Sequence, residues 1–164
     1  IQEFTISGVP VLPGRYDWHE VNLSYRSDSS APVNVGVRAQ KSGLFGGDLL
    51  SYGPSVGFRR GETLNALFSW TRNDIDLPMG QVITNLASTR VVYNFSTRVF
   101  AQGLVQYNDS ADLWSVNLRF GWLQAANTGF FLVYNEADGL GDFTLTGSGR
   151  SLVLKYSNLF DLLN

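Results

Sequence analysis

Bulky apolar and small or polar residues alternate most regularly in Leu113–Gln124. Because successive side chains of a β-strand point to opposite faces, Trp114 and Trp122 share one face, while Asn117 and Arg119 share the other. An apolar face with aromatic ends, opposite a small and polar face, is typical of a transmembrane β-barrel strand. Half of a soluble β-sandwich shows the same pattern, so the rest of the chain must decide between the two folds.

The same alternation, interrupted by turn residues, predicts about ten strands and no helix. We expect the strands at residues 2–7, 16–28, 33–42, 49–59, 63–73, 81–95, 97–108, 112–125, 129–137 and 149–160. Most connections alternate between short turns (27–32, 60–62, 96, 125–128) and longer loops (8–15, 43–48, 74–80, 137–148).

Outer-membrane barrels combine an even strand number with short periplasmic turns and longer extracellular loops. The sequence therefore predicts one all-β domain over residues 1–164, an antiparallel up-and-down transmembrane β-barrel. An even strand number would place both termini in the periplasm of a Gram-negative bacterium.

Aromatic residues of the bulky faces lie preferentially near the strand ends. We predict two membrane-interface girdles, at the short-turn end Tyr25, Phe58, Phe95, Trp122 and Phe160, and at the loop end Trp70, Tyr107 and Trp114. The alternative is a soluble barrel with these side chains in its core. A barrel of this size has too little interior to enclose all the bulky faces, which favours the membrane.

The opposite faces combine small and polar residues with basic ones. We expect Arg38, Arg90, Arg119 and Lys155 to line the lumen near mid-strand, with Arg26, Arg59 and Arg98 nearer the short turns and Glu20 as the clear inward acid. Rings of arginine or lysine favour anions. The resulting hypothesis is a small passive pore that prefers small anionic solutes.

Two alternatives stay open. In the first, the arginines fill a narrow interior and hydrogen-bond there, and the protein is a non-conducting membrane anchor or interaction barrel. In the second, the chain is a soluble ligand-binding barrel, which would fold in water without detergent.

Composition excludes several other classes. The net charge of −2 argues against a general nucleic-acid binder, and the absence of cysteine excludes disulfides and thiol chemistry. The sequence contains no apolar run of about 18 residues that would predict a transmembrane helix. Ile1–Glu3 has neither the basic nor the apolar start of a signal peptide.

Candidate catalytic and metal-binding residues are few. His19 is the only histidine, and it shares strand parity with Val21, which points it toward lipid or the barrel rim. Acidic residues of the expected loops lack the spacing of an EF-hand and are expected to be solvated: Asp74, Asp76, Asp138 and Asp142. We therefore expect no enzymatic activity, no metal and no cofactor.

Several strand segments together resemble a known family. They are Ser88–Arg98, Phe100–Asn108, Asn117–Trp122, Phe131–Asn135 and Arg150–Tyr156, and the resemblance is clearest over residues 70–160. They resemble the uncharacterised outer-membrane β-barrel region that follows carbohydrate-binding family-9-like domains in many Gram-negative bacteria. The resemblance implies a barrel in contact with the lipids and lipopolysaccharide of the outer membrane.

The last expected strand, Arg150–Phe160, also looks like the strand that such barrels present to the barrel insertion machinery. Barrels of this kind usually end on the aromatic residue, whereas Asp161–Asn164 follow it here, and Asn158 interrupts the apolar face.

Overall fold

A computed structural model describes residues 4–125, 128–139 and 149–158. This part of the chain is all-β, and none of it forms a helix long and apolar enough to cross a membrane. A small hairpin of β1 (Phe4–Ile6) and β2 (Val9–Val11) precedes a single sheet of nine strands. The strands of the sheet are β3 (Glu20–Arg26), β4 (Val33–Leu44), β5 (Gly47–Arg60), β6 (Leu64–Leu77), β7 (Gly80–Asn94), β8 (Val99–Asn108), β9 (Leu113–Ala125), β10 (Thr128–Gly139) and β11 (Gly149–Ser157).

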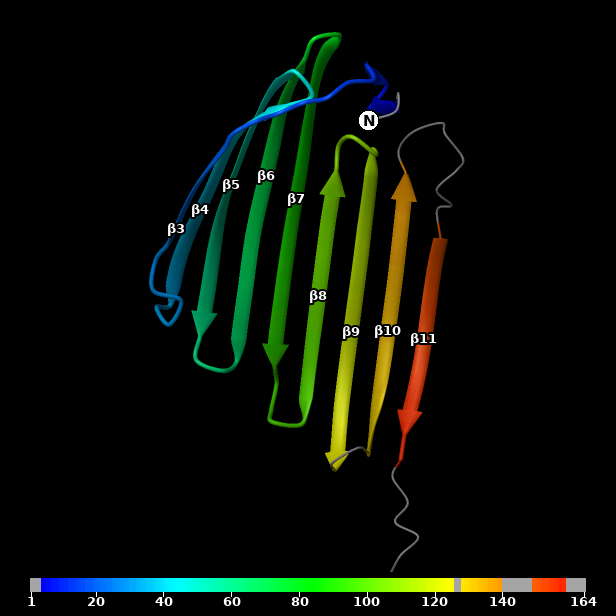
Figure 1. Cartoon of the computed structure of the whole chain (residues 1–164). Helices are drawn as coiled ribbons and strands as arrows, with labels where there is room; N and C mark the ends of the chain where they lie inside the picture. The colour runs from blue at the N-terminus through cyan, green and yellow to red at the C-terminus, as the bar shows by residue number, and fades with distance from the viewer. Residues whose placement is uncertain (1–3, 126–127, 140–148, 159–164) are drawn as a thin grey trace, which may run out of the picture.

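Each strand of the sheet pairs antiparallel with its neighbour in sequence, which confirms the predicted up-and-down topology. The sheet is curved but open, because β3 and β11 are its two edges and do not pair with each other (Figure 1). The described residues therefore form an open nine-stranded sheet and not the closed barrel of about ten strands that the sequence predicted. Since nine is an odd number, β3 and β11 run in the same direction.

The expected first strand, residues 2–7, does not join the sheet. Phe4–Ile6 instead pairs with Val9–Val11, a strand that the sequence analysis missed. Ser7 and Gly8 connect the two with φ values of 46° and 84°, and two consecutive positive φ values fit a tight hairpin turn. Pairing across such a short loop costs little chain entropy, so this segment folds locally.

The predicted alternation of loop lengths was wrong at two connections. Phe45 and Gly46 alone join β4 to β5, and Pro78 and Met79 alone join β6 to β7. The strands run on through residues expected to form loops, because antiparallel pairing continues to Leu44↔Gly47 and Leu77↔Gly80. The connection 140–148 lies outside the described residues.

The odd strand number also removes the basis for placing both termini on one side. The β1–β2 hairpin lies at the end of the sheet that carries the β6–β7 turn, and β11 ends at the opposite end (Figure 1). We call these the hairpin end and the open end.

The sheet has two chemically different faces, which the strand register defines. Cross-strand partners share a face, so the pairs Val56↔Phe68, Val105↔Val116 and Leu132↔Leu154 lie on one mainly apolar face, the outer face. The ion pair of Glu136 and Arg150 interrupts this face on β10 and β11. The inner face contains Arg38, Ser69 and the other residues of opposite parity.

The outer face has no covering layer within the described structure. Leu23 is 70%, Leu118 47% and Leu154 64% exposed. The chain exposes 11901 Å² in all, against roughly 8,100 Å² for a globular monomer of this mass. Exposed apolar side chains gathered on one face in this way mark an interaction surface.

The small buried core of the described residues lies at the hairpin end. Strand β2 packs against β7, and the buried apolar side chains are Val11, Leu77 and Val82. The Phe45 ring of the β4–β5 turn makes edge contacts with Phe4, Tyr16 and Trp18 at centroid distances of 5.2, 5.7 and 5.9 Å. The N-terminal segment is thereby held over the inner face at this end of the sheet.

Candidate functional site

The predicted girdle residues of the hairpin end lie in one row across the outer face. Trp70 pairs with Ala87, which pairs with Tyr107, which in turn pairs with Trp114. The Tyr107 and Trp114 rings lie 4.6 Å apart between centroids. Tyr52 extends the row by a T-shaped contact with Trp70 at 5.7 Å.

The girdle predicted for the other end is less regular. Tyr25, Phe58 and Trp122 are exposed on the outer face near the open end. Phe95 lies in the β7–β8 turn, where its ring meets Tyr93 at 4.8 Å. Phe160 lies outside the described residues.

The residues predicted to line the lumen are brought to the inner face with one exception. Strand register places these on it: Glu20, Arg26, Arg38, Arg59, Arg90, Arg119 and Lys155. Arg98 belongs to the β7–β8 turn and not to a strand. These residues do not form one ring, since they spread over six strands of the open sheet, from β3 to β11.

Arg119 differs from the other inner arginines because aromatic rings hold it. Its guanidinium carbon lies 4.9 Å from the centroid of Phe131 and 5.8 Å from that of Phe100. A Cβ on Gly121 would come 2.4 Å from the Phe100 ring, so this glycine makes room for the ring. The cation–π contacts give Arg119 a structural role.

The inner face is less polar than predicted on β7–β11. Apolar side chains occupy inner positions there, among them Leu86, Leu104, Phe100, Phe131 and Val153. The sequence signal for them is the loss of alternation in Phe100–Tyr107 and Gly129–Tyr134, where bulky residues occur at both parities. The part formed by β3–β6 is more hydrophilic, although Leu67 occupies an inner position of β6 between Gly57 and Arg90.

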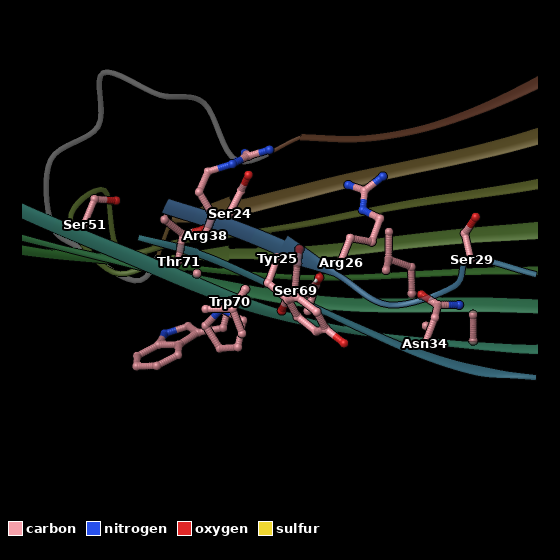
Figure 2. Close-up of a pocket in the computed structure, with 18 of the residues that line it drawn as sticks. Ser24, Tyr25, Arg26, Ser29, Asn34, Arg38, Ser51, Ser69, Trp70 and Thr71 are labelled. Atoms are coloured by element: carbon pink, nitrogen blue, oxygen red, sulfur yellow. Dashed lines mark hydrogen bonds between the residues drawn. The ribbon is translucent and has the colours of Figure 1, made fainter. Parts of the chain in front are cut away.

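That hydrophilic part contains a cavity of about 790 Å³, lined by residues of β3, β4, β5 and β6 together with Ser29. Figure 2 shows Arg26, Arg38 and Ser24 on one side of the strands, and Tyr25 and Trp70 on the other.

Glycines form much of the cavity floor. An added Cβ would come 2.7 Å from Ser55 Oγ at Gly36 and 2.4 Å from Asn34 Oδ1 at Gly57. The side chains of Ser55 and Asn34 lie across these glycines, so a larger residue at either position would displace them and fill part of the cavity.

The cavity is positively charged and contains no acid. Its charged residues are Arg26, Arg38 and Arg59. In the described part of the chain the ion pairs are Arg15–Asp17 and Arg150–Glu136, so the three cavity arginines have no carboxylate partner. Glu20, the inner acid of β3, accepts a hydrogen bond from Asn22.

The remaining candidates for chemistry do not assemble into a site. His19 precedes β3 and accepts a backbone hydrogen bond from Gly43 at 3.2 Å. Asp74 accepts a hydrogen bond from Gln81, and Asp76 pairs across the sheet with Asp48. Among the described residues no group of three potential metal ligands is found. Asp142 lies outside them.

Asp109 has a structural role in the β8–β9 turn. Burial raises the pKa of its carboxyl, but hydrogen bonds donated by the backbone and side chain of Asn85 outweigh this and lower the pKa below its usual value. The carboxylate is thereby kept ionised and ties this turn to β7.

Comparison with known proteins identifies no related protein. No family model, no curated protein and no solved structure matches the chain. The resemblance to the outer-membrane barrel family therefore stays a prediction, and the function must be argued from the geometry.

Proposed function

We propose that the chain forms the wall of an outer-membrane β-barrel of a Gram-negative bacterium and lines a passive, anion-preferring pore. The observation that carries the proposal is the apolar outer face, which on β5–β9 runs up to the Trp70–Trp114 aromatic row and lies opposite the arginine-containing inner face. On β10 and β11 the charged rim begins one step earlier, with the ion pair of Glu136 and Arg150 at the level of Val116. Charged residues follow directly beyond the row, with Arg72 and Asp74 on the same face of β6. Apolar band, aromatic belt and polar rim follow one another as in a barrel wall.

The height of the band supports this proposal. On β9 the outer face runs from Trp114 to Trp122, nine residues including both ends. A transmembrane β-strand needs about 9–11 residues when it is tilted by about 45°. The wall thus has the length that a bilayer requires.

Membrane insertion also requires partners for β3 and β11. A bilayer does not tolerate an unpaired sheet edge, because the free backbone groups would have no water to bind. Since these strands run in the same direction, an antiparallel closure needs an odd number of further strands between them.

The partners of the proposed protein follow from the two faces. Lipid and lipopolysaccharide would cover the outer face, and small anionic solutes would pass along the inner one. The outer residues of β11, Leu152, Leu154 and Tyr156, are exposed at the sheet edge and suit recognition by the barrel insertion machinery. The proposal assigns the protein no enzymatic step and no cofactor.

One observation favours a second candidate, a non-conducting membrane anchor. The β1–β2 hairpin packs on β7 and buries Val11 at the hairpin end of the inner face. A segment held there narrows any passage along the inner face, whereas an anchor needs no passage.

Tryptophan fluorescence tests the orientation of the outer face. The purified protein is folded into vesicles whose lipids carry bromine on the acyl chains. We expect strong quenching, because Trp114 and Trp122 point to the outer face and are 44% and 56% exposed. A Trp70→Phe/Trp114→Phe/Trp122→Phe variant, which removes the three tryptophans of the outer face, is the control and should lose most of the quenching. Unquenched emission from a protein that stays folded in water without detergent would overturn the proposal.

Conductance measurements on a hairpin variant separate the pore from the anchor. Val11 is 3% exposed, whereas its neighbour Leu12 is 53% exposed. A Val11→Asp substitution buries an unpaired charge and should detach the hairpin, and Leu12→Asp should not. In planar bilayers we expect a larger conductance for Val11→Asp than for Leu12→Asp, with a reversal potential that shows anion preference. Absence of current in both variants would favour the anchor.

A further inference from the structure

We infer that Arg26 and Arg38 form a binding site for the phosphoryl group of a small hydroxylated solute. The two residues lie on neighbouring strands, since Arg26 of β3 pairs with Gly36 and Arg38 follows two positions along β4. Diagonal neighbours of this kind lie about 7–8 Å apart, within reach of two long side chains. Figure 2 shows both side chains on the same side of the sheet.

Ser24 and Gly36 are the cross-strand partners of Arg38 and Arg26, so only one small side chain shares this part of the inner face with the two arginines. Gly36 carries no side chain and is buried beneath Ser55, whose hydroxyl donates to the Gly36 carbonyl. Each guanidinium presents a planar fork of donors that matches the oxygens of a phosphate. Two such forks on adjacent strands can bind one tetrahedral anion together.

The absence of competing acids makes these arginines available. The cavity lining contains Arg26, Arg38 and Arg59 but no Asp or Glu. Arg119, by contrast, is an inner arginine whose guanidinium group contacts the rings of Phe100 and Phe131. The positive charge of the cavity is thus uncompensated by the described residues, and an anionic ligand would compensate it.

The rest of the cavity favours a hydroxylated skeleton. Neutral polar side chains line it without a hydrogen-bond partner in the described structure: Ser24, Asn34, Gln40, Ser51 and Thr71. They supply both donors and acceptors, as sugar hydroxyls require. The volume of about 790 Å³ exceeds the space of a bare ion and lies within the usual range of small-molecule sites.

The same cavity disfavours a nucleotide. Bases are generally bound by stacking on aromatic rings, but Tyr25 and Trp70 point to the opposite side of the strands from Arg26 and Arg38 (Figure 2). A phosphorylated sugar is therefore the chemical class that the site fits. This inference rests on the proposed function in one respect, which is that the inner face must be open to water.

Calorimetric titration of the full chain in detergent micelles tests the site with glucose 6-phosphate, inorganic phosphate and glucose as probes. We expect glucose 6-phosphate to bind most tightly, inorganic phosphate more weakly and glucose not detectably. In Arg26→Gln/Arg38→Gln the affinity for glucose 6-phosphate should fall about tenfold or more, because charge-assisted hydrogen bonds are lost.

The matched control is Arg15→Gln/Arg98→Gln, which removes the same charge at exposed residues that do not line the cavity, Arg15 before β3 and Arg98 in the β7–β8 turn. It should change the affinity less than about twofold, because exposed distant charges are screened. An equal loss in both variants would reduce the effect to net charge and overturn the site. Equal affinities for phosphate and glucose 6-phosphate would overturn the hydroxylated class of ligand.

The two proposals can fail separately. Bromine quenching in vesicles together with no binding in micelles would overturn the phosphoryl site and leave the membrane wall standing. Binding in micelles together with unquenched tryptophan in vesicles would support the phosphoryl site and overturn the membrane wall. Unchanged near-ultraviolet circular dichroism of the variants identifies those that fold.

Discussion

Replacing Leu118 with arginine should weaken the membrane-inserted protein by about 2–4 kcal/mol, the cost of a basic side chain near the middle of a bilayer on the lipid face of a barrel. Leu118 lies midway along β9, pairs with Gly103 and Tyr134 on the outer face and is 47% exposed. Denaturant unfolding of the protein in lipid vesicles, followed by tryptophan emission, measures the change in the free energy of unfolding.

A Gln106→Arg variant is the control on the other face. Gln106 lies on the inner face of β8 between Ser88 and Ser115, so the same side chain there would extend into water. We expect its free energy of unfolding to change by less than about 0.5 kcal/mol, as for an ordinary surface substitution. If Leu118→Arg were as mild as this control, the outer face would not be in contact with lipid.

Alternation was sufficient to predict which residues share a face. In Leu113–Ala125 the parity of each residue decides its face, and the residues of the Trp114–Trp122 series share one face of the sheet. The row that joins Trp70 to Tyr107 and Trp114 depends on register, which parity alone does not give. Register follows from the lengths of the turns, and the turns were the weakest part of the prediction.

The turns were mispredicted for a physical reason. Asp48, Asp74 and Asp76 were assigned to loops, but they lie on β5 and β6 beyond the aromatic row. A strand that extends beyond an apolar band has water on both sides, so its sequence loses the alternation that identifies it. The tight turn at Phe45 also uses a φ of 50° at a non-glycine residue, which the sequence does not signal.

The sequence also could not predict which inner arginines are held by aromatic rings and which are not. Arg38 and Arg119 have the same parity and similar mid-strand positions, and both were predicted to line a lumen. They differ because Arg119 meets Phe131 of β10 and Phe100 of β8, whereas Arg38 faces Ser24 and Gly53 across the strands. Partners of this kind are distant in sequence and become known only from the register.

Gly47→Ala should destabilise the hairpin end of the sheet by about 1–3 kcal/mol, the usual cost of forcing extra volume into a packed site. A Cβ at Gly47 would lie 1.9 Å from the carbonyl oxygen of Asp76 and 3.0 Å from the Cα of Leu77. Both atoms belong to the backbone of β6, so no side-chain rotation can relieve the clash. The two strands must separate beside Leu77, which belongs to the small buried core under the β1–β2 hairpin.

The matched control for this prediction is Gly103→Ala, which adds the same methyl group to a strand glycine elsewhere. Its Cβ would meet only Leu118 Cδ2, at 3.3 Å, and a leucine side chain can move by a few tenths of an ångström. We expect Gly103→Ala to leave the denaturation midpoint nearly unchanged and Gly47→Ala to lower it. Since Val11 depends on the same end of the sheet for its burial, Gly47→Ala should also raise amide hydrogen exchange in β2. Equal midpoints for the two variants would mean that β5 and β6 are not packed as closely at this end as the register requires.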